Sequence, residues 1–231
     1  MGGIITMTDP PAALLRLMHL VSPSLPTGAF AYSQGLEWAV EAGWVANAPD
    51  LEAWLADLIR NSLARVDVPL LVRMIAACRD NRCHDLARWC DILLSLRETQ
   101  ELRREETNRG RAMASVLDGM AVIMTPEENR CVQTSQLAGF AVAAARWRIS
   151  TGQAAAGYLW SWLENQVLAG IKIIPLGQTA GHRILMRLDA PLMKAVAMGL
   201  DIMDNDIGSS NPALAIASCR HETQYTRLYR S

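Results

Sequence analysis

The sequence predicts an all-α protein, a single-domain bundle of about ten helices with a flexible C-terminal tail. Alanine, leucine and methionine dominate the apolar residues, and phenylalanine occurs only twice. Residues that favour strands are therefore scarce, whereas residues that favour helices are abundant. Hydrophobic residues make up 51% of the 231 residues, which is enough for one large core. No repeat or domain break is visible, so we expect one domain over residues 1–231.

The first helix is predicted to start at Asp9-Pro10-Pro11, with the aspartate as its cap and proline in its first turn. Apolar residues at helical spacing continue to Val21. Two prolines and a glycine within residues 22–28 end this helix, because they cannot continue it. A second helix is expected from near Tyr32 to Glu41.

The next helices are expected to be short and separate. Pro49-Asp50 predicts the start of a third helix, with Leu51, Leu55 and Leu58 on one face. A fourth helix is expected from Val68-Pro69 to about Cys78. A fifth is expected over residues 84–94.

A highly charged helix is predicted from about Glu98 to Met120, because Ser95-x-x-Glu98 has the capping-box pattern. Glu105 and Arg109 are four residues apart in the favourable order, which supports an exposed helix face. The charge run from Glu98 to Arg111 is typical of a solvated face, and a partner surface is the alternative.

The second half of the chain contains clear signals for the starts of helices. Thr125-Pro126-Glu127-Glu128 predicts one start, and Ser150-x-x-Gln153 predicts another capping box. The helix after Ser150, to about Ala169, is apolar almost all round and is expected to be central. The remaining predictions are helices over residues 135–148, 176–188 and 190–203, then a polar hinge over 204–211. Residues from about 204 to 231 are expected to be a hinge and a partner-binding tail.

The charge balance and the apolar runs limit the possible classes. The chain has 22 basic and 23 acidic side chains, which argues against a nucleic-acid-binding protein. No apolar run approaches the roughly 20 residues of a membrane helix, so no membrane association is expected. The first twenty residues lack the series of features of a signal peptide, and the five cysteines do not form a disulfide framework. We therefore expect a cytoplasmic protein.

Metal-binding patterns are weak. Four potential ligands lie within thirteen residues, namely Cys78, Cys83, His84 and Cys90. Their spacing differs from that of structural zinc sites, which favours buried or incidental thiols over a zinc or nickel site. Cys219 and His221 are a weak candidate pair for a metal ion. His19, within an apolar helix, is expected to be a partly buried histidine with its hydrogen bonds satisfied.

No catalytic motif is present. The sequence contains neither a G-x-S-x-G nucleophile elbow nor a G-x-x-x-x-G-K-[ST] phosphate-binding loop. The chain is therefore predicted not to be an enzyme and to have no intrinsic cofactor.

Two segments indicate protein contacts. Residues 220–230 contain three arginines and two tyrosines, the types enriched at interface anchors, although a frayed terminus is the alternative. Residues 22–37 combine a rigid turn with small and hydroxyl-bearing residues, although an ordinary helix-breaking loop has this composition as well. Trp160 and Trp162 are more typical of a core.

Three blocks resemble the UreF family of urease accessory proteins. They are Ser22 to Glu37, with its Leu-Pro-Thr-Gly-Ala-Phe-Ala-Tyr-Ser-Gln-Gly-Leu-Glu, Trp160 to Gly181, and Arg220 to Ser231. Glu98 to Arg111 resembles the family's Arg/Glu-Glu-Thr segment less specifically. Residues 1–8 and 78–90 contribute nothing to the resemblance.

The resemblance implies an all-α, non-catalytic chaperone. Together with UreD/UreH and the GTPase UreG, it would load nickel into apo-urease and gate the GTPase cycle. It also implies a homodimer within the complex, GTP bound by UreG, and nickel that passes through the assembly. Two alternatives stay open: a GTPase-activating protein for UreG, and a direct nickel carrier.

The resemblance also suggests contact residues. On the UreG side we expect Glu164, Lys172 and Gln178, because a lysine in an apolar run is costly to bury without a partner. On the UreD/UreH and dimer side we expect residues from two of the blocks: Arg220, Glu222, Gln224, Tyr225, Arg227, Tyr32, Ser33 and Glu37.

Overall fold

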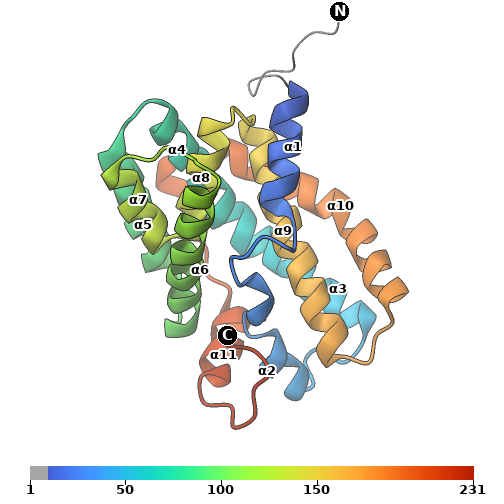
Figure 1. Cartoon of the computed structure of the whole chain (residues 1–231). Coiled ribbons are helices and arrows are strands. Elements are labelled where there is room, and N and C mark those ends of the chain that lie inside the picture. Colours follow the sequence, from blue (N-terminus) through green and yellow to red (C-terminus); the bar gives the residue numbers. More distant parts are fainter. Residues whose placement is uncertain (1–9) are drawn as a thin grey trace, which may run out of the picture.

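The computed structural model of the chain describes residues 10–231, and Asp9, the predicted cap of the first helix, lies outside this range. The described residues form helices joined by turns, with no strand among them, which confirms the all-α prediction (Figure 1). Within residues 10–231, no helix has the length and apolar character needed to cross a membrane.

The first part of the chain is less helical than predicted. Helix α1 (Pro10–Val21) is followed by a short 3-10 turn, η1 (Ala29–Ala31), and by α2 (Leu36–Glu41). The prediction that the second helix starts near Tyr32 is wrong, because Gly35 has a left-handed φ of 79°. A Cβ on Gly35 would lie 2.8 Å from the backbone nitrogen of Ser218. This glycine therefore lets the C-terminal helix approach α2 closely.

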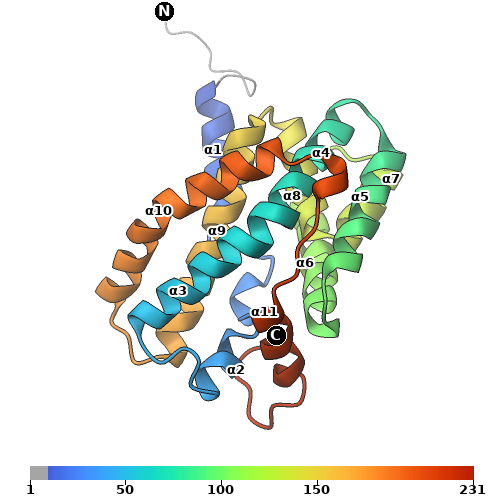
Figure 2. The same ribbon diagram turned by 180° about the vertical axis from the view of Figure 1, so that it is seen from behind.

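The third and fourth predicted helices are one continuous rod. Asn47 caps α3 (Ala48–Leu58) by accepting a 3.0 Å hydrogen bond from the Asp50 nitrogen. A π-helical segment, η2 (Ile59–Asp67), then leads directly into α4 (Val68–Arg79). Figure 2 shows this rod running diagonally across the side of the molecule that faces the viewer. The apolar pattern could not reveal the join, because Pro69 reads as a helix start.

The capping box predicted at Ser95 is wrong, as two local hydrogen bonds show. Ser95 lies inside α5 (Cys83–Leu96), where its hydroxyl donates to the Ile92 carbonyl at 2.7 Å. The residue that caps α6 (Gln100–Gly119) is Thr99, whose Oγ1 accepts from the Leu102 nitrogen at 3.2 Å. The predicted start of α7 (Pro126–Thr134) is confirmed, since Thr125 and Glu128 form a complete capping box.

The most apolar helices lie inside the bundle. Helix α8 (Gln136–Arg146) packs against α4 and α6, and every residue from 137 to 144 is buried. Helix α9 (Thr151–Ile173), capped by Ser150 as predicted, packs against α1, α4, α8 and α10. Its expected central position is therefore confirmed (Figure 1).

The two helices predicted over residues 176–188 and 190–203 are one helix, α10 (Gln178–Asp201), with Pro191 in its interior. The buried stripe Ile184, Leu188, Leu192 and Ala195 packs against α9 and η2, which offsets the hydrogen bond lost at proline. A 3-10 turn, η3 (Asp204–Asp206), and an extended stretch then lead to α11 (Pro212–His221).

Candidate functional site

The residues after η3, here called the C-terminal segment (212–231), fold back onto the body of the chain. Helix α11 packs against α2 and α6, and the last residues lie beside η1 and α2 (Figure 1). The Ser33 nitrogen and hydroxyl both donate to the Ser231 carbonyl, at 2.7 and 2.6 Å. The Arg230 nitrogen donates to the Ala31 carbonyl at 2.8 Å. The sequence predicted a flexible tail, whereas these bonds join its end to the residues at and after η1.

Three carboxylates hold the segment in place, and we call Glu37, Glu101 and Glu105 the carboxylate cluster. Glu37 accepts from the backbone nitrogens of Leu228 and Tyr229, at 2.6 and 2.9 Å. Because one side chain satisfies two backbone donors, the chain end is fixed by its backbone as well as by its side chains.

Glu37 also faces His221, which is fully buried. The Nε2 atom of His221 lies 3.2 Å from Glu37, and its Nδ1 atom lies 2.8 Å from Glu101. Glu101 also accepts from Nη1 of Arg227 at 2.9 Å. The histidine therefore links α2 and α6 through α11.

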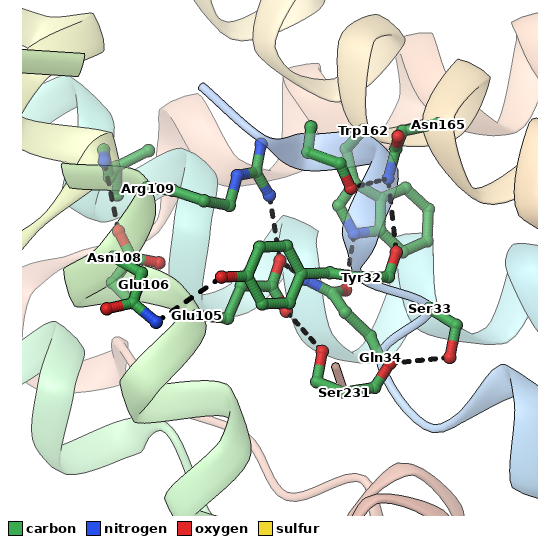
Figure 3. Close-up of polar contacts among 12 residues, drawn as sticks. Tyr32, Ser33, Gln34, Glu105, Glu106, Asn108, Arg109, Trp162, Asn165 and Ser231 are labelled. Carbon is green, nitrogen blue, oxygen red and sulfur yellow. Dashed lines mark hydrogen bonds and ion pairs between the residues drawn. The ribbon is translucent and has the colours of Figure 1, made fainter. Parts of the chain in front are cut away.

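The third carboxylate, Glu105, joins the other motif blocks. It accepts hydrogen bonds from the Ser231 hydroxyl, the Gln34 amide and the Arg109 guanidinium, each at 2.9 Å (Figure 3). Gln34 in turn accepts from Nε1 of Trp162 at 2.8 Å. All four segments that resemble UreF thus meet at one place.

The charged helix has an exposed face that includes Arg103, Arg104 and Arg111, but the expectation that Glu105 and Arg109 lie on it is wrong. Glu105 is only 3% exposed, Glu101 and Glu106 are buried as well, and the Arg109 side chain is 11% exposed. Single-sequence reasoning could not see this, because the partners of these carboxylates come from residues 34, 97, 221 and 231. These partners offset the cost of burying the charges.

A second polar network lies next to the carboxylate cluster, because Glu106 directly follows Glu105 on α6. Arg97 donates to Asp67 at 2.7 Å and to Glu106 at 3.0 Å, and the Tyr158 hydroxyl donates to Asp67 at 2.9 Å. Burial opposes the charge of Arg97, yet Asp67 and Glu106 raise the pKa of Arg97 well above its ordinary value. Burial raises the pKa of Glu106, but Arg97 and two hydrogen-bond donors outweigh it, so that this pKa is lowered.

The predicted UreD/UreH-side residues divide into two groups. Ser33 and Glu37 bond to the last residues of the chain. The Tyr32 hydroxyl accepts from Asn108 of α6 at 3.5 Å, and the side chains of Arg227 and Glu222 also bond to α6. Glu222, in particular, accepts from the nitrogens of Gln100 and Glu101 at the start of α6. Gln224 donates to Glu41 and to the Thr226 carbonyl. By contrast, Arg220 is exposed and Tyr225 is fully exposed.

The predicted UreG-side residues lie along α9 and at the start of α10. Lys172, in the last turn of α9, and Gln178, the first residue of α10, are both exposed. Glu164 lines a cavity of about 130 Å³ beside Asn165 and Phe30, and burial raises its pKa. No hydrogen bond or ion pair joins these three side chains to one another within the described part of the chain.

The metal candidates do not come together. Cys219 is exposed, whereas His221 is buried with both ring nitrogens facing carboxylates. Among residues 10–231, no group of three or more His, Cys, Asp or Glu side chains is arranged to hold a metal ion.

Sequence reasoning missed several residues of the site. Gln34, Glu101, Glu105, Arg109 and Asn165 were not proposed as contacts, although Asn165 donates to the Ala29 carbonyl at 3.0 Å. The available signal was their position inside the segments that resemble UreF.

Comparison with known proteins identifies the family. Residues 45–189 match the family model UreF. A protein from Alcanivorax borkumensis named urease accessory protein UreF is 50% identical over 95% of this chain and 99% of its own length. Proteins of the same name from Pseudomonas putida and Klebsiella pneumoniae are 47% and 44% identical, over 95% and 94% of this chain and 98% and 97% of their own lengths. The chain therefore belongs to the UreF family of urease accessory proteins.

Proposed function

We propose that the protein is a non-catalytic chaperone that holds UreD/UreH and UreG on apo-urease while nickel is inserted. The observation that carries this proposal is the docked C-terminal segment. Its backbone is fixed by Glu37 and Ser33, while Tyr225 and Leu228 are 102% and 65% exposed. Large exposed apolar side chains on a fixed backbone are typical of a surface that another protein covers.

The docked segment is the proposed binding surface for UreD/UreH. Arg220 and Tyr225 project from it without being needed for its fold, and Ile216 on α11 is 48% exposed. Arginine and tyrosine at such positions can anchor a partner with little loss of conformational entropy, because the backbone that carries them is already ordered.

The exposed end of α9 is the proposed contact for UreG. Lys172 is exposed and lies in the last turn of its helix, where a cation is favoured by the helix dipole. A carboxylate on UreG would pair with it. Through this contact the protein would gate the GTPase cycle, with GTP bound by UreG and nickel carried as cargo of the complex.

A homodimer is part of the proposal. Leu14, Leu15 and Met18 of α1 are 47%, 60% and 55% exposed, at a helical spacing that gives one apolar stripe. A second copy of the chain would cover this stripe and remove it from water.

The proposal is tested by reconstitution. The full-length chain is mixed with UreD/UreH, UreG, apo-urease, GTP and nickel, and urease activity and complex size are measured. A complex of all components and an activation that depends on this chain would support the chaperone. Activation of equal yield without the chain would contradict it.

The same mixture separates the chaperone from a GTPase-activating protein. Single-turnover GTP hydrolysis by UreG is measured with and without the chain. A rise in rate that one arginine substitution abolishes would favour an inserted arginine. An unchanged or lower rate would favour gating by a scaffold.

A further inference from the structure

A second site lies away from the docked segment, between α5 and α7. Here an open cavity of about 400 Å³ is lined by Cys83, Cys90 and Cys131, with His84, Asp91 and Arg130 beside them. Cys131 comes from α7, while Cys83 and Cys90 come from α5. The fold therefore brings a cysteine from a distant part of the chain to two cysteines that the sequence places on one helix.

Two of these thiols lie on facing helices. Cys90 on α5 is 2% exposed and Cys131 on α7 is 7% exposed, and both side chains line the same cavity between the two packed helices. Hydrogen bonding from Cys90 lowers the pKa of Cys131, and the Arg130 guanidinium lowers it further. The same contact and burial raise the pKa of Cys90. The pair is thus unequal, with the pKa of Cys131 lowered and that of Cys90 raised.

The remaining cysteines lack this arrangement. Burial raises the pKa of Cys78 to about 12, so its thiol stays protonated. The Cys83 sulfur lies 3.8 Å from the Thr125 hydroxyl. Cys219 is exposed on α11 and does not line the cavity. Among the five cysteines, only Cys131 combines a lowered pKa, a second thiol on the facing helix and a cavity open to solvent.

We propose that Cys131 and Cys90 are a modification site at which a hydroperoxide oxidises the protein to an internal disulfide between α5 and α7. The Cys131 thiolate attacks the peroxide oxygen, the O–O bond breaks, and sulfenic acid forms as the peroxide leaves as water or an alcohol. The Cys90 sulfur then attacks the sulfur of the sulfenic acid. A second water leaves, carrying the Cys90 proton, and the S–S bond forms. Two thiols are oxidised and one peroxide is reduced.

The site fits a small oxidant. The cavity is open enough for hydrogen peroxide, and the thiol that reacts first borders the cavity. The cross-link would tie the short helix α7 to α5, which already pack against one another. A thiol reductant would reverse it by exchange.

The test uses the full-length protein and hydrogen peroxide, followed by alkylation of free thiols and peptide mass mapping without reductant. The wild-type protein is compared with Cys131→Ser, Cys90→Ser and the control Cys219→Ser, with helicity checked by circular dichroism. Dimedone is added to trap sulfenic acid.

We expect the wild type and Cys219→Ser to give one peptide pair joined through Cys90 and Cys131. In Cys90→Ser, dimedone should label Cys131, because the second thiol is missing. In Cys131→Ser, neither product should form. If the wild-type map shows no Cys90–Cys131 peptide, or if the main product joins Cys219 residues of two chains, the proposal is wrong. The wild-type map decides the matter even if a variant fails to fold.

Discussion

The carboxylate of Glu37 lies 3.2 Å from Nε2 of His221, so that α2 and the end of α11 meet inside the protein. The same carboxylate accepts the backbone nitrogens of Leu228 and Tyr229. One side chain therefore bonds to both α11 and the last residues of the C-terminal segment. The surface proposed for UreD/UreH depends in part on this contact.

Replacing Glu37 with glutamine should release the last residues. The amide keeps one acceptor but loses the charge, and hydrogen bonds to charged groups contribute about 1.5–3 kcal/mol each. We expect the free energy of unfolding to fall by about 1–3 kcal/mol and the amides of Leu228 and Tyr229 to exchange faster with deuterium. Hydrogen exchange and urea unfolding check this.

Glu52→Gln is the matched control, because Glu52 forms an ion pair with Arg187 whose side chain is 64% exposed. Exposed pairs of this kind contribute at most about 1 kcal/mol. An equal loss in both variants would contradict the role assigned to Glu37.

Replacing Arg97 with methionine should destabilise the protein strongly. Asp67 and Glu106 would then be buried without their cation. Breaking a buried pair from one side costs about 3–5 kcal/mol. Thermal unfolding at neutral pH measures the loss, and Arg130→Met, which breaks a pair in which both side chains are more than half exposed, is the control.

The dependence of stability on pH should differ between that variant and the wild type. In the wild type, the pKa of Glu106 lies below its ordinary value of 4.5. The contribution of the ionised Glu106 side chain to the free energy of unfolding is therefore complete above pH 4.5. It is lost as the pH falls through the folded-state pKa. Without Arg97, only the hydrogen bonds from Ser135 and Leu137 oppose the effect of burial on Glu106. The pKa of Glu106 should therefore be higher in the variant than in the wild type, so acidification should narrow the difference in stability between the two proteins. Urea unfolding from pH 7 to pH 4 tests this, and a difference that grows toward low pH would contradict it.

A methyl group at Gly110 should disrupt the contact between α6 and α7. A Cβ there would lie 2.5 Å from the Val132 carbonyl oxygen and 2.8 Å from the Ser135 nitrogen. Both are backbone atoms, so relief requires a helix to move. We expect the free energy of unfolding of Gly110→Ala to fall by about 1–3 kcal/mol, which is typical of overpacked cores.

Gly119→Ala on the same helix is the control, because nothing lies within 4 Å of a Cβ at Gly119. Alanine is favoured over glycine within a helix by up to about 1 kcal/mol, so this variant should be neutral or more stable. Thermal unfolding compares the two variants, and equal stability would contradict the close approach.

Lys172→Ala should weaken capture of UreG while the fold remains intact. The side chain is exposed at the end of α9, so its removal leaves no buried group without a partner. Binding of UreG, measured by surface plasmon resonance at two salt concentrations, should fall and lose part of its salt dependence. Binding equal to that of the wild type would show that the contact lies elsewhere.

The helix starts that the sequence predicted correctly depend on local chemistry. Thr125 with Glu128, and Ser150 with the Gln153 nitrogen, form their caps from residues three apart. The residue pattern that predicts such bonds can be recognised in a single sequence. The Ser95 pattern was misleading because the same residue types also occur inside a helix, where Ser95 bonds the Ile92 carbonyl.

The features that the sequence could not reveal depend on distant residues. Pro191 stays within a helix because the buried stripe on α10 packs against α9 and η2. Glu105 is buried because Gln34, Arg109 and Ser231 satisfy it, and two of these partners are about 70 and 126 residues away along the chain. Periodicity describes one helix at a time, whereas burial of a charge depends on the whole fold.

The central claim is that the fixed C-terminal segment presents a surface for UreD/UreH. The most direct measurement is the affinity of the full-length protein for UreD/UreH after Tyr225→Ala, with Met186→Ala on α10 as the control. Both side chains are largely exposed, at 102% and 74%, so neither change should affect folding. We predict that Tyr225→Ala lowers the affinity by about 1–3 kcal/mol, while Met186→Ala leaves it unchanged. Equal affinity for Tyr225→Ala and the wild type would contradict the claim.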